Sequence, residues 1–281
     1  MKLIKFDDVS QYYRRIESYL LQNEAINCLP LATGLNLCNS DRHKSSYLAL
    51  VETNGTVLAA AIYIRDRKLL LSKSGDLKAI ELIAKDLAVN FPSISGITAP
   101  HEEAETFVAV WQKLTGQSIE LEVAMQIQQL ERINAIDYAA GKLRLATVTE
   151  IKLLTKWIQE FVKEAIGVNE SEADLHQWVI RHLEQDSFYI WENKNKLVSM
   201  AAFGGTTPNG IRVGSVYTPP EHRGDGYATS CVAALSQVLL ERHKYCFLFT
   251  DMTNATSNKI YQKIGYVAMG KIMDYKFCQY C

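Results

Sequence analysis

The sequence predicts an α/β protein of two successive domains, each a twisted mixed β-sheet flanked by helices. A chain of 281 residues favours two domains over one. Each half, about 140 residues long, shows the same order of helices, hairpin, strand, helix, strand, helix, strand. The apolar run from Tyr245 to Thr250 has the pattern of a parallel strand buried on both faces. We therefore expect a tandem repeat of one unit, with the boundary in the weakly periodic stretch 137–142 and domains at 1–140 and 141–281.

The elements of the first half follow from apolar periodicity and turn signals. Asp8 or Ser10 can cap a first helix, and a second short helix is expected up to about Leu37. Asn54-Gly55 predicts a hairpin, since both positions tolerate positive φ. The remaining elements are expected at 69–72 (strand), 76–89 (helix capped by Ser74), 94–98 (strand), 100–114 (helix) and 119–130 (strand).

The second half repeats this order with clearer signals. Helices are expected from Thr149 to Ile166 and from Glu172 to Leu183, then a hairpin about Lys194-Asn195. A strand from Ile211 to Tyr217 ends before two prolines, which cannot continue a ladder. The remaining expected elements are a helix from 227, the strand 245–250, a helix at 257–264 and a last strand at 266–277.

Composition narrows the classes of function. The chain is 48% hydrophobic and 22% charged, with a formal net charge of −1, so no basic field indicates nucleic acid or an anionic membrane as a partner. No apolar run approaches the ~20 residues that span a bilayer, and the N-terminus lacks the pattern of a signal peptide. We expect a cytoplasmic protein. Cys278 and Cys281 have CxxC spacing, which without a second ligand pair favours reduced thiols over a zinc site.

The segment Arg223-Gly-Asp-Gly-Tyr-Ala228 carries the main chemical signal, an R-x-x-G-x-A loop between a strand and a helix. The amides of the first helical turn and the helix dipole make such a loop a backbone anion site suited to a pyrophosphate. The loop lacks the Lys-Ser/Thr of a P-loop and the third glycine of a dinucleotide-binding fingerprint.

This loop resembles the acyl-CoA pyrophosphate loop of the GNAT superfamily of N-acyltransferases. A second match follows downstream, where Asn254, Asn258, Tyr261 and Gly265 resemble the family's Asn, Tyr and Lys-x-Gly-Phe/Tyr signature. The two matches span 216–266, and the element order extends the resemblance over 143–277. The first half has neither motif, because 72–77 holds one glycine and an acidic residue. It therefore resembles a degenerate copy, which we expect to bind acyl-CoA poorly and to serve as a lid, a substrate wall or a dimer surface.

The resemblance implies acetyl-CoA as co-substrate, no metal, and a single site in the second half. Tyr261 matches the family's general acid, which protonates the leaving thiolate. The residues implied in cofactor binding are Val216, Tyr217, Thr218, Arg223, Gly224, Asp225, Gly226, Tyr227, Ala228, Thr229, Asn254 and Asn258. Apart from the resemblance, Tyr261 could be a core aromatic, Asn254 a helix cap and Arg223 a solvated loop charge.

The expected reaction moves an acetyl group to a primary amine, borne by a small molecule or a peptide, by direct attack with both substrates bound. The general base is left open among Glu160, Glu164, Glu221, His222, Asp251 and a water chain. No nucleic acid or membrane partner is expected, and a homodimer is compatible with the sequence. The alternatives are a non-catalytic acyl-CoA sensor and, more weakly, an aminoacyl transferase.

Overall fold

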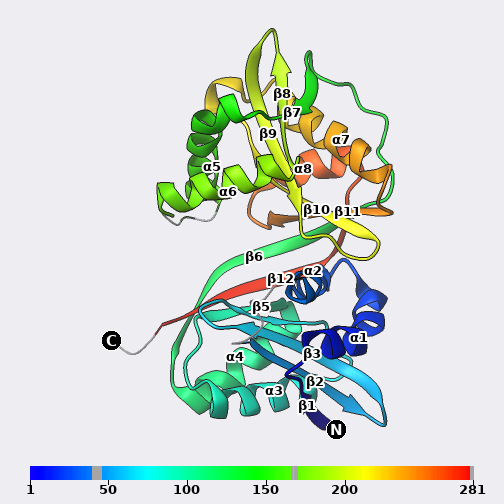
Figure 1. Cartoon of the computed structure of the whole chain (residues 1–281), viewed down its shortest axis with the longest axis vertical. Coiled ribbons are helices and arrows are strands. Elements are labelled where there is room, and N and C mark those ends of the chain that lie inside the picture. The colour runs from blue at the N-terminus through cyan, green and yellow to red at the C-terminus, as the bar shows by residue number, and fades with distance from the viewer. Residues whose placement is uncertain (40–45, 166, 168–169, 279–281) are drawn as a thin grey trace. The chain divides into compact units, whose positions relative to one another are not determined.

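The computed structural model describes residues 1–39, 46–165, 167 and 170–278 (Figure 1). The chain divides into two compact units, one of residues 1–127 with 269–281 and one of residues 128–268. Both are mixed α/β folds, as expected. The division differs from the expected boundary at 140/141 in two ways, since it falls at 127/128 and the last strand of the chain returns to the first unit. The position of Cys281, which would complete the CxxC pair, lies outside the described residues.

The first unit has helices on both faces of its sheet. The strands follow the order β1-β2-β3-β4-β5-β12-β6. The strands are β1 (Lys2–Lys5), β2 (Ser46–Thr53), β3 (Thr56–Ile64), β4 (Leu69–Leu71), β5 (Gly96–Pro100), β6 (Ser118–Leu130) and β12 (Val267–Cys278). The helices are α1 (Val9–Leu20), the 3-10 turn η1 (Leu21–Asn23), α2 (Cys28–Cys38), α3 (Leu77–Asn90) and α4 (His101–Thr115).

Alternation along β3 shows how the two faces form. Ala59 and Ala61 enter the core shared with α3 and α4, whereas Ala60 and Ile62 enter the core under α1 and α2. Successive strand residues point to opposite faces, so one strand supplies both cores. Asp8 caps α1, as expected, but the cap of α3 is Asp76 instead of Ser74, because the Asp76 carboxylate accepts from the Lys78 amide.

The second unit repeats this plan. Its strands follow the order β11-β10-β9-β8-β7, with the end of β6 beside β11. The strands are β7 (Lys142–Leu145), β8 (Phe188–Asn193), β9 (Lys196–Gly204), β10 (Gly210–Tyr217) and β11 (Tyr245–Asp251). The helices are η3 (Val148–Glu150), α5 (Ile151–Ala165), α6 (Glu172–Glu184), η4 (Pro220–His222), α7 (Tyr227–Leu240) and α8 (Ala255–Ile264). One core lies under α7 and α8 and the other under α5 and α6.

No helix among the described residues is long and apolar enough to cross a bilayer.

Candidate active site

Strand β10 leaves its parallel neighbour halfway along its length. It pairs with β11 only at Gly210, Ile211 and Arg212 within the described residues, although it continues to Tyr217. On its other edge β10 pairs with β9 up to Gly214, and the register skips to Tyr217. Ser215 at this irregularity has a φ of +50°, which is the left-handed region. The segment of Val216, Tyr217 and Thr218 therefore ends a strand that has separated from β11.

This end of β10 is held from β9. The buried Ser199 hydroxyl donates to the carbonyl of Tyr217 at 3.2 Å and lies 2.9 Å from the Thr218 hydroxyl. The backbone carbonyl of Thr218 also accepts from the Arg223 Nε at 2.9 Å. Side chains thus hold the end of β10 in place, although this part of the strand does not pair with β11. Nothing in the sequence around Ser199 indicated this role.

The loop after β10 presents its backbone amides at the start of α7. Gly224 and Gly226 have φ values of +92° and +78°, a conformation that a residue with a Cβ rarely adopts. Gly226 occupies the N-cap position of α7 without a side-chain cap. Within the described residues, the amides of 224–229 donate to no protein acceptor, and the first to do so is that of Ser230, to the carbonyl of Gly226 at 3.0 Å.

The surroundings of the loop leave room for a ligand. A Cβ at Gly224 would meet nothing within 4 Å, and one at Gly226 would meet only Ala139, at 3.9 Å. Gly224, Asp225 and Gly226 are exposed, Ala228 is half-buried, and Thr229 is buried. The Tyr227 hydroxyl accepts from the Asn193 amide at 2.8 Å, which anchors the first turn of α7 to β8. The loop and the first turn of α7 together present six amides that donate to no described protein group, which is an anion-binding arrangement.

Two carboxylates of α5 face this region. Glu160 accepts a hydrogen bond from the Tyr217 hydroxyl at 2.8 Å, and Glu164 forms an ion pair with Arg223 at 2.8 Å. The Arg223 guanidinium also lies 5.7 Å from the centroid of the Tyr217 ring. Burial and the hydrogen bond from Tyr217 to the Glu160 carboxylate raise the pKa of the Tyr217 phenol. Arg223 is therefore more than a solvated loop charge, since it joins the loop, β10 and α5.

Asn254 and Asn258 organise the junction between β11 and α8. The side-chain Oδ1 of Asn254 accepts from the Ser257 amide at 3.0 Å, which makes Asn254 the N-cap of α8. Asn258 donates to the carbonyl of Asp251 at 3.3 Å and accepts from Gln128 at the same distance. Gln128 also donates to the Thr250 hydroxyl. Both asparagines thus have structural roles at the end of β11, the strand next to β10 in the sheet.

Tyr261 lies on α8 inside the core that also contains Cys231. Its side chain is 8% exposed, and Val216 packs against the same core. Its hydroxyl makes no hydrogen bond within the part of the chain that the structure describes. Burial raises the pKa of Tyr261 to about 12, and the neighbouring Cys231 adds to the rise. The Tyr261 hydroxyl therefore remains protonated at neutral pH and keeps its proton available for donation.

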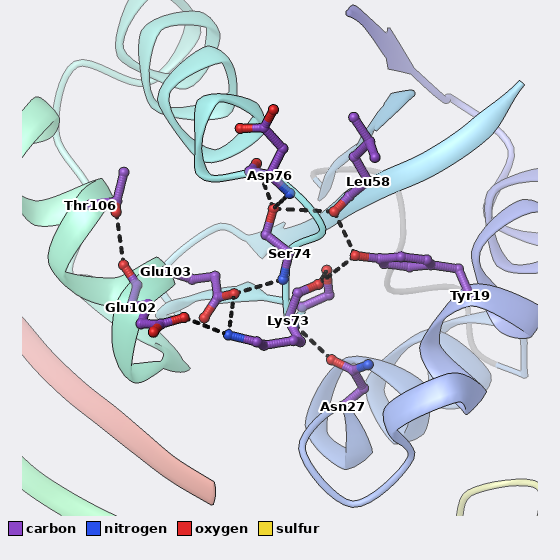
Figure 2. A network of polar contacts seen from close by, with 10 residues as sticks. Tyr19, Asn27, Leu58, Lys73, Ser74, Asp76, Glu102, Glu103 and Thr106 are labelled. Atoms are coloured by element: carbon purple, nitrogen blue, oxygen red, sulfur yellow. Dashed lines mark hydrogen bonds and ion pairs between the residues drawn. The ribbon is translucent and has the colours of Figure 1, made fainter. Parts of the chain in front are cut away.

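The corresponding loop of the first unit is closed by the protein itself (Figure 2). The amide of Lys73 donates to Asn27, that of Ser74 to the Glu103 carboxylate at 2.7 Å, and that of Gly75 to the carbonyl of Leu58. The amides of Asp76 and Lys78 are taken by the Ser74 hydroxyl and the Asp76 carboxylate.

Charged side chains complete this closure. The Lys73 ammonium lies between Glu102 at 2.8 Å and the fully buried Glu103 at 3.1 Å, and Figure 2 shows both carboxylates pointing at it. The Glu103 carboxylate thus accepts from the Ser74 amide and pairs with the Lys73 ammonium, the two groups that could otherwise bind an external anion. The amides of 73–76 and 78 donate to protein acceptors, whereas no described protein group accepts from the amides of 224–229, so the two loops differ in the donors that they leave free.

The described residues contain no group of three or more His, Cys, Asp or Glu side chains placed to hold a metal ion.

The acetyltransferase (GNAT) family model matches residues 153–266. No curated protein matches the sequence significantly. The fold of the whole chain is similar to that of solved structures. A GNAT-family acetyltransferase from Colwellia psychrerythraea has 13% identity and a TM-score of 0.61, and the match covers 99% of this chain and all of that one.

Two further structures share the full-length fold. A GCN5-related N-acetyltransferase from Sphaerobacter thermophilus has 13% identity and a TM-score of 0.60, with 98% of this chain and 95% of that chain covered. A tandem GNAT protein from the clavulanic acid biosynthesis pathway has 11% identity and a TM-score of 0.52, with 99% and 98% covered. The expected architecture of two tandem GNAT-like domains is therefore confirmed at the level of the fold.

Proposed function

We propose that the second unit, in which residues 153–266 match the acetyltransferase (GNAT) family model, transfers an acetyl group from acetyl-CoA to a primary amine. The observation that carries the proposal is the row of amides at 224–229 that donate to no described protein group and follow the separated end of β10 in the chain. The closed loop of the first unit supports a single site in the chain, in the second unit.

The loop is suited to the pyrophosphate of acetyl-CoA by charge and by space. The amides of 224–229 supply donors, the dipole of α7 adds positive potential, and the two glycines leave the approach open. Arg223 would add a cation next to these amides once it exchanges Glu164 for a phosphate oxygen. The bound acetyl-CoA supplies an activated thioester to the site.

The end of β10 would hold the pantetheine arm by its backbone, since β11 no longer occupies that edge. We assign polarisation of the thioester carbonyl to the amide of Val216 or Tyr217. An amide fixed in advance by Ser199 and the β9 pairing would stabilise negative charge on that oxygen without reorganising. Asn254 and Asn258 would border the arm from the end of β11.

Tyr261 would act on the sulfur of the leaving group. A thiol has a pKa of ~8.5, so complete proton transfer from a phenol of pKa about 12 to a thiolate is uphill by roughly 5 kcal/mol. Hydrogen-bond donation to the developing thiolate requires no such transfer and would stabilise the charge as it forms. The amine loses one proton when it is acylated, which balances the proton that the thiol gains.

The acidic side chains of α5 support a cationic amine as acceptor. A primary amine is mostly protonated at neutral pH and must lose a proton before its nitrogen can attack. Glu160 lies against the hydroxyl of Tyr217, and Glu164 follows one helical turn later. In the proposed site these carboxylates would attract the ammonium group and accept its proton directly or through water.

The proposal is tested by measuring thiol release from acetyl-CoA with a panel of polyamines, amino acids, aminoglycosides and peptide N-termini. We expect turnover with at least one cationic amine, and mass spectrometry of that amine should show the addition of one acetyl group. Glu160→Gln should raise the KM for the amine more than the Kd for CoA.

Binding of CoA without acetylation of any amine would favour the alternative function, a non-catalytic acyl-CoA sensor. In that case CoA binds, no amine of the panel is acetylated, and Tyr261→Phe leaves binding and all other measured behaviour unchanged. Absence of CoA binding would reject both readings of the site.

A further inference from the structure

A cavity of about 320 Å³ lies in the first unit, between α2 and strands β3 and β4. Its lining residues are Thr33, Ile62, Ile64, Arg67, Lys68 and Leu70. This volume is in the range of pockets that hold small molecules. At ~30 Å³ per water molecule it corresponds to about ten waters, too little for the whole of CoA. All of its lining residues belong to the first unit, whereas the proposed acetyltransferase site is built from residues of the second.

The wall of the cavity is aliphatic. Ile62 and Ile64 lie two residues apart on β3 and share one face of the sheet, and Leu70 on β4 is the register partner of Ile62. Ile62 is 1% exposed, whereas Ile64 and Leu70 are only partly buried. An apolar body placed against these three side chains would remove the remaining apolar surface from water.

The polar groups of the cavity are donors. Lys68 is held by ion pairs with Glu122 and Asp274, and Asp274 also accepts from the Thr98 hydroxyl at 2.9 Å. The Lys68 charge is therefore compensated within the unit. The Thr33 hydroxyl and the Arg67 guanidinium have neither a hydrogen bond nor an ion pair with any residue that the structure describes. Besides Lys68, two donors, one of them cationic, thus line the aliphatic cavity without an acceptor among the residues that the structure describes.

We propose that this cavity binds a small organic acid, with its carboxylate on Arg67 and Thr33 and its apolar body against Ile62, Ile64 and Leu70. The planar guanidinium fork matches a carboxylate in a bidentate arrangement, and the hydroxyl adds one more donor. A neutral analogue of the same shape lacks this match, and a cationic one is repelled by Arg67. The proposal is independent of the acetyltransferase function, since no residue of the second unit takes part.

The experiment titrates the full chain with benzoate, benzyl alcohol and benzylammonium, followed by saturation-transfer NMR and calorimetry. We expect benzoate to bind at least about ten-fold more tightly than benzyl alcohol, and benzylammonium not to bind. Arg67→Gln should weaken benzoate binding by about ten-fold or more, and Thr33→Val by less. Both side chains are at least partly exposed, so the variants should fold.

Arg65→Gln is the matched control, because it removes the same charge from the same turn but from a residue outside the cavity lining. It should leave benzoate binding within about two-fold of the original value. Equal affinities for benzoate and benzyl alcohol, equal effects of the two arginine variants, or no benzoate binding at millimolar concentration would each overturn the proposal.

Discussion

The burial of Tyr261 determines what its hydroxyl can do. The side chain shares a core with Cys231, its hydroxyl has no hydrogen bond within the described residues, and burial raises its pKa to about 12. A phenol in this state is a poor source of a fully transferred proton but a good hydrogen-bond donor to a nearby anion. The sequence motif identified the residue, whereas its protonation behaviour depends on packing that the motif does not describe.

We predict that Tyr261→Phe lowers kcat by about ten- to hundred-fold and changes the Kd for CoA by less than about three-fold. The phenyl ring preserves the packing of α8, so the loss would come from the hydroxyl. The measurement is steady-state turnover from pH 6 to 9 together with CoA titration by calorimetry. Turnover equal to that of the original protein across this range would exclude a role for the hydroxyl in the reaction.

His182 gives a prediction for the pH dependence of stability. Its ring lies 3.9 Å from that of Trp178, and its Nδ1 lies 2.6 Å from the Ser187 hydroxyl. Burial, with a smaller contribution from Arg181, lowers the pKa of His182 to about 4. The unfolded chain binds this proton near pH 6.5, so the stabilising contribution is complete above pH 6.5 and is lost as the pH falls towards 4.

We therefore expect the free energy of unfolding to fall less between pH 7 and pH 4.5 in His182→Gln than in the original protein. After allowing for partial exposure of the ring, the difference should be roughly 1–2 kcal/mol. Urea unfolding followed by tryptophan fluorescence at the two pH values measures it. Parallel losses in both proteins would show that His182 titrates normally in the folded state.

At the scale of elements, the loop between β4 and α3 and the equivalent loop between β10 and α7 differ in whether their backbone amides donate to other protein groups. Between β4 and α3 the amides are taken by Asn27, Glu103 and neighbouring groups, and between β10 and α7 they are unoccupied. Only the second can bind an external anion without first breaking internal hydrogen bonds, since a lost buried hydrogen bond costs about 1–3 kcal/mol.

Gly226→Glu should abolish CoA binding, because it places a carboxylate beside the amides of the loop. The substitution also strains the backbone, since φ at Gly226 is +78°. Gly55→Glu is the matched control, with a φ of +81° and no atom within 4 Å of an added Cβ. We expect similar losses of thermal stability in both variants and loss of CoA binding by at least about 100-fold in Gly226→Glu alone. Retained CoA affinity in Gly226→Glu would reject the assignment of the loop.

Local chemistry explains which elements the sequence could predict. The hairpins at Asn54-Gly55 and Lys194-Asn195 form as expected, with positive φ at all four residues. Asp8 caps α1 because its carboxylate accepts from the Gln11 amide three residues away. The short strands β1 and β7 were missed, since four residues carry little periodicity and both form by pairing with distant strands.

Contacts between distant residues set the limit of prediction at the site. The motif located the loop and Tyr261, but the pairing of Glu160 with Tyr217 joins residues 57 apart in the sequence. The closure of the first loop by Glu103 spans 29 residues and has no local signature. Such pairs form only when helices and strands pack together. The sequence pattern predicts the helices and strands but not which of their side chains come into contact.

At the scale of the whole molecule, the last strand of the chain, β12, returns to the first unit. Five residues of β12, from Ile272 to Lys276, pair antiparallel with β5. Phe277 stacks near Phe107 and Trp111, so the strand also contributes to the core under α4. The first unit therefore needs residues from both ends of the chain, which a boundary drawn at 140/141 from element order separates.

We predict that cutting the chain at 140/141 yields a first fragment that does not fold alone. Fragment 1–140 would expose the edge of β5 at Gly96, whose backbone approaches Tyr275 so closely that an added Cβ would lie 2.1 Å from that carbonyl oxygen. It would also expose the aromatic surface covered by Phe277 and leave Lys68 without Asp274. Co-expression of 1–140 with 141–281 should restore a soluble complex that melts cooperatively. Circular dichroism and thermal unfolding of each fragment alone and of the pair measure whether they fold. A cooperative melt of fragment 1–140 at the melting temperature of the intact chain would show that the first unit folds without β12.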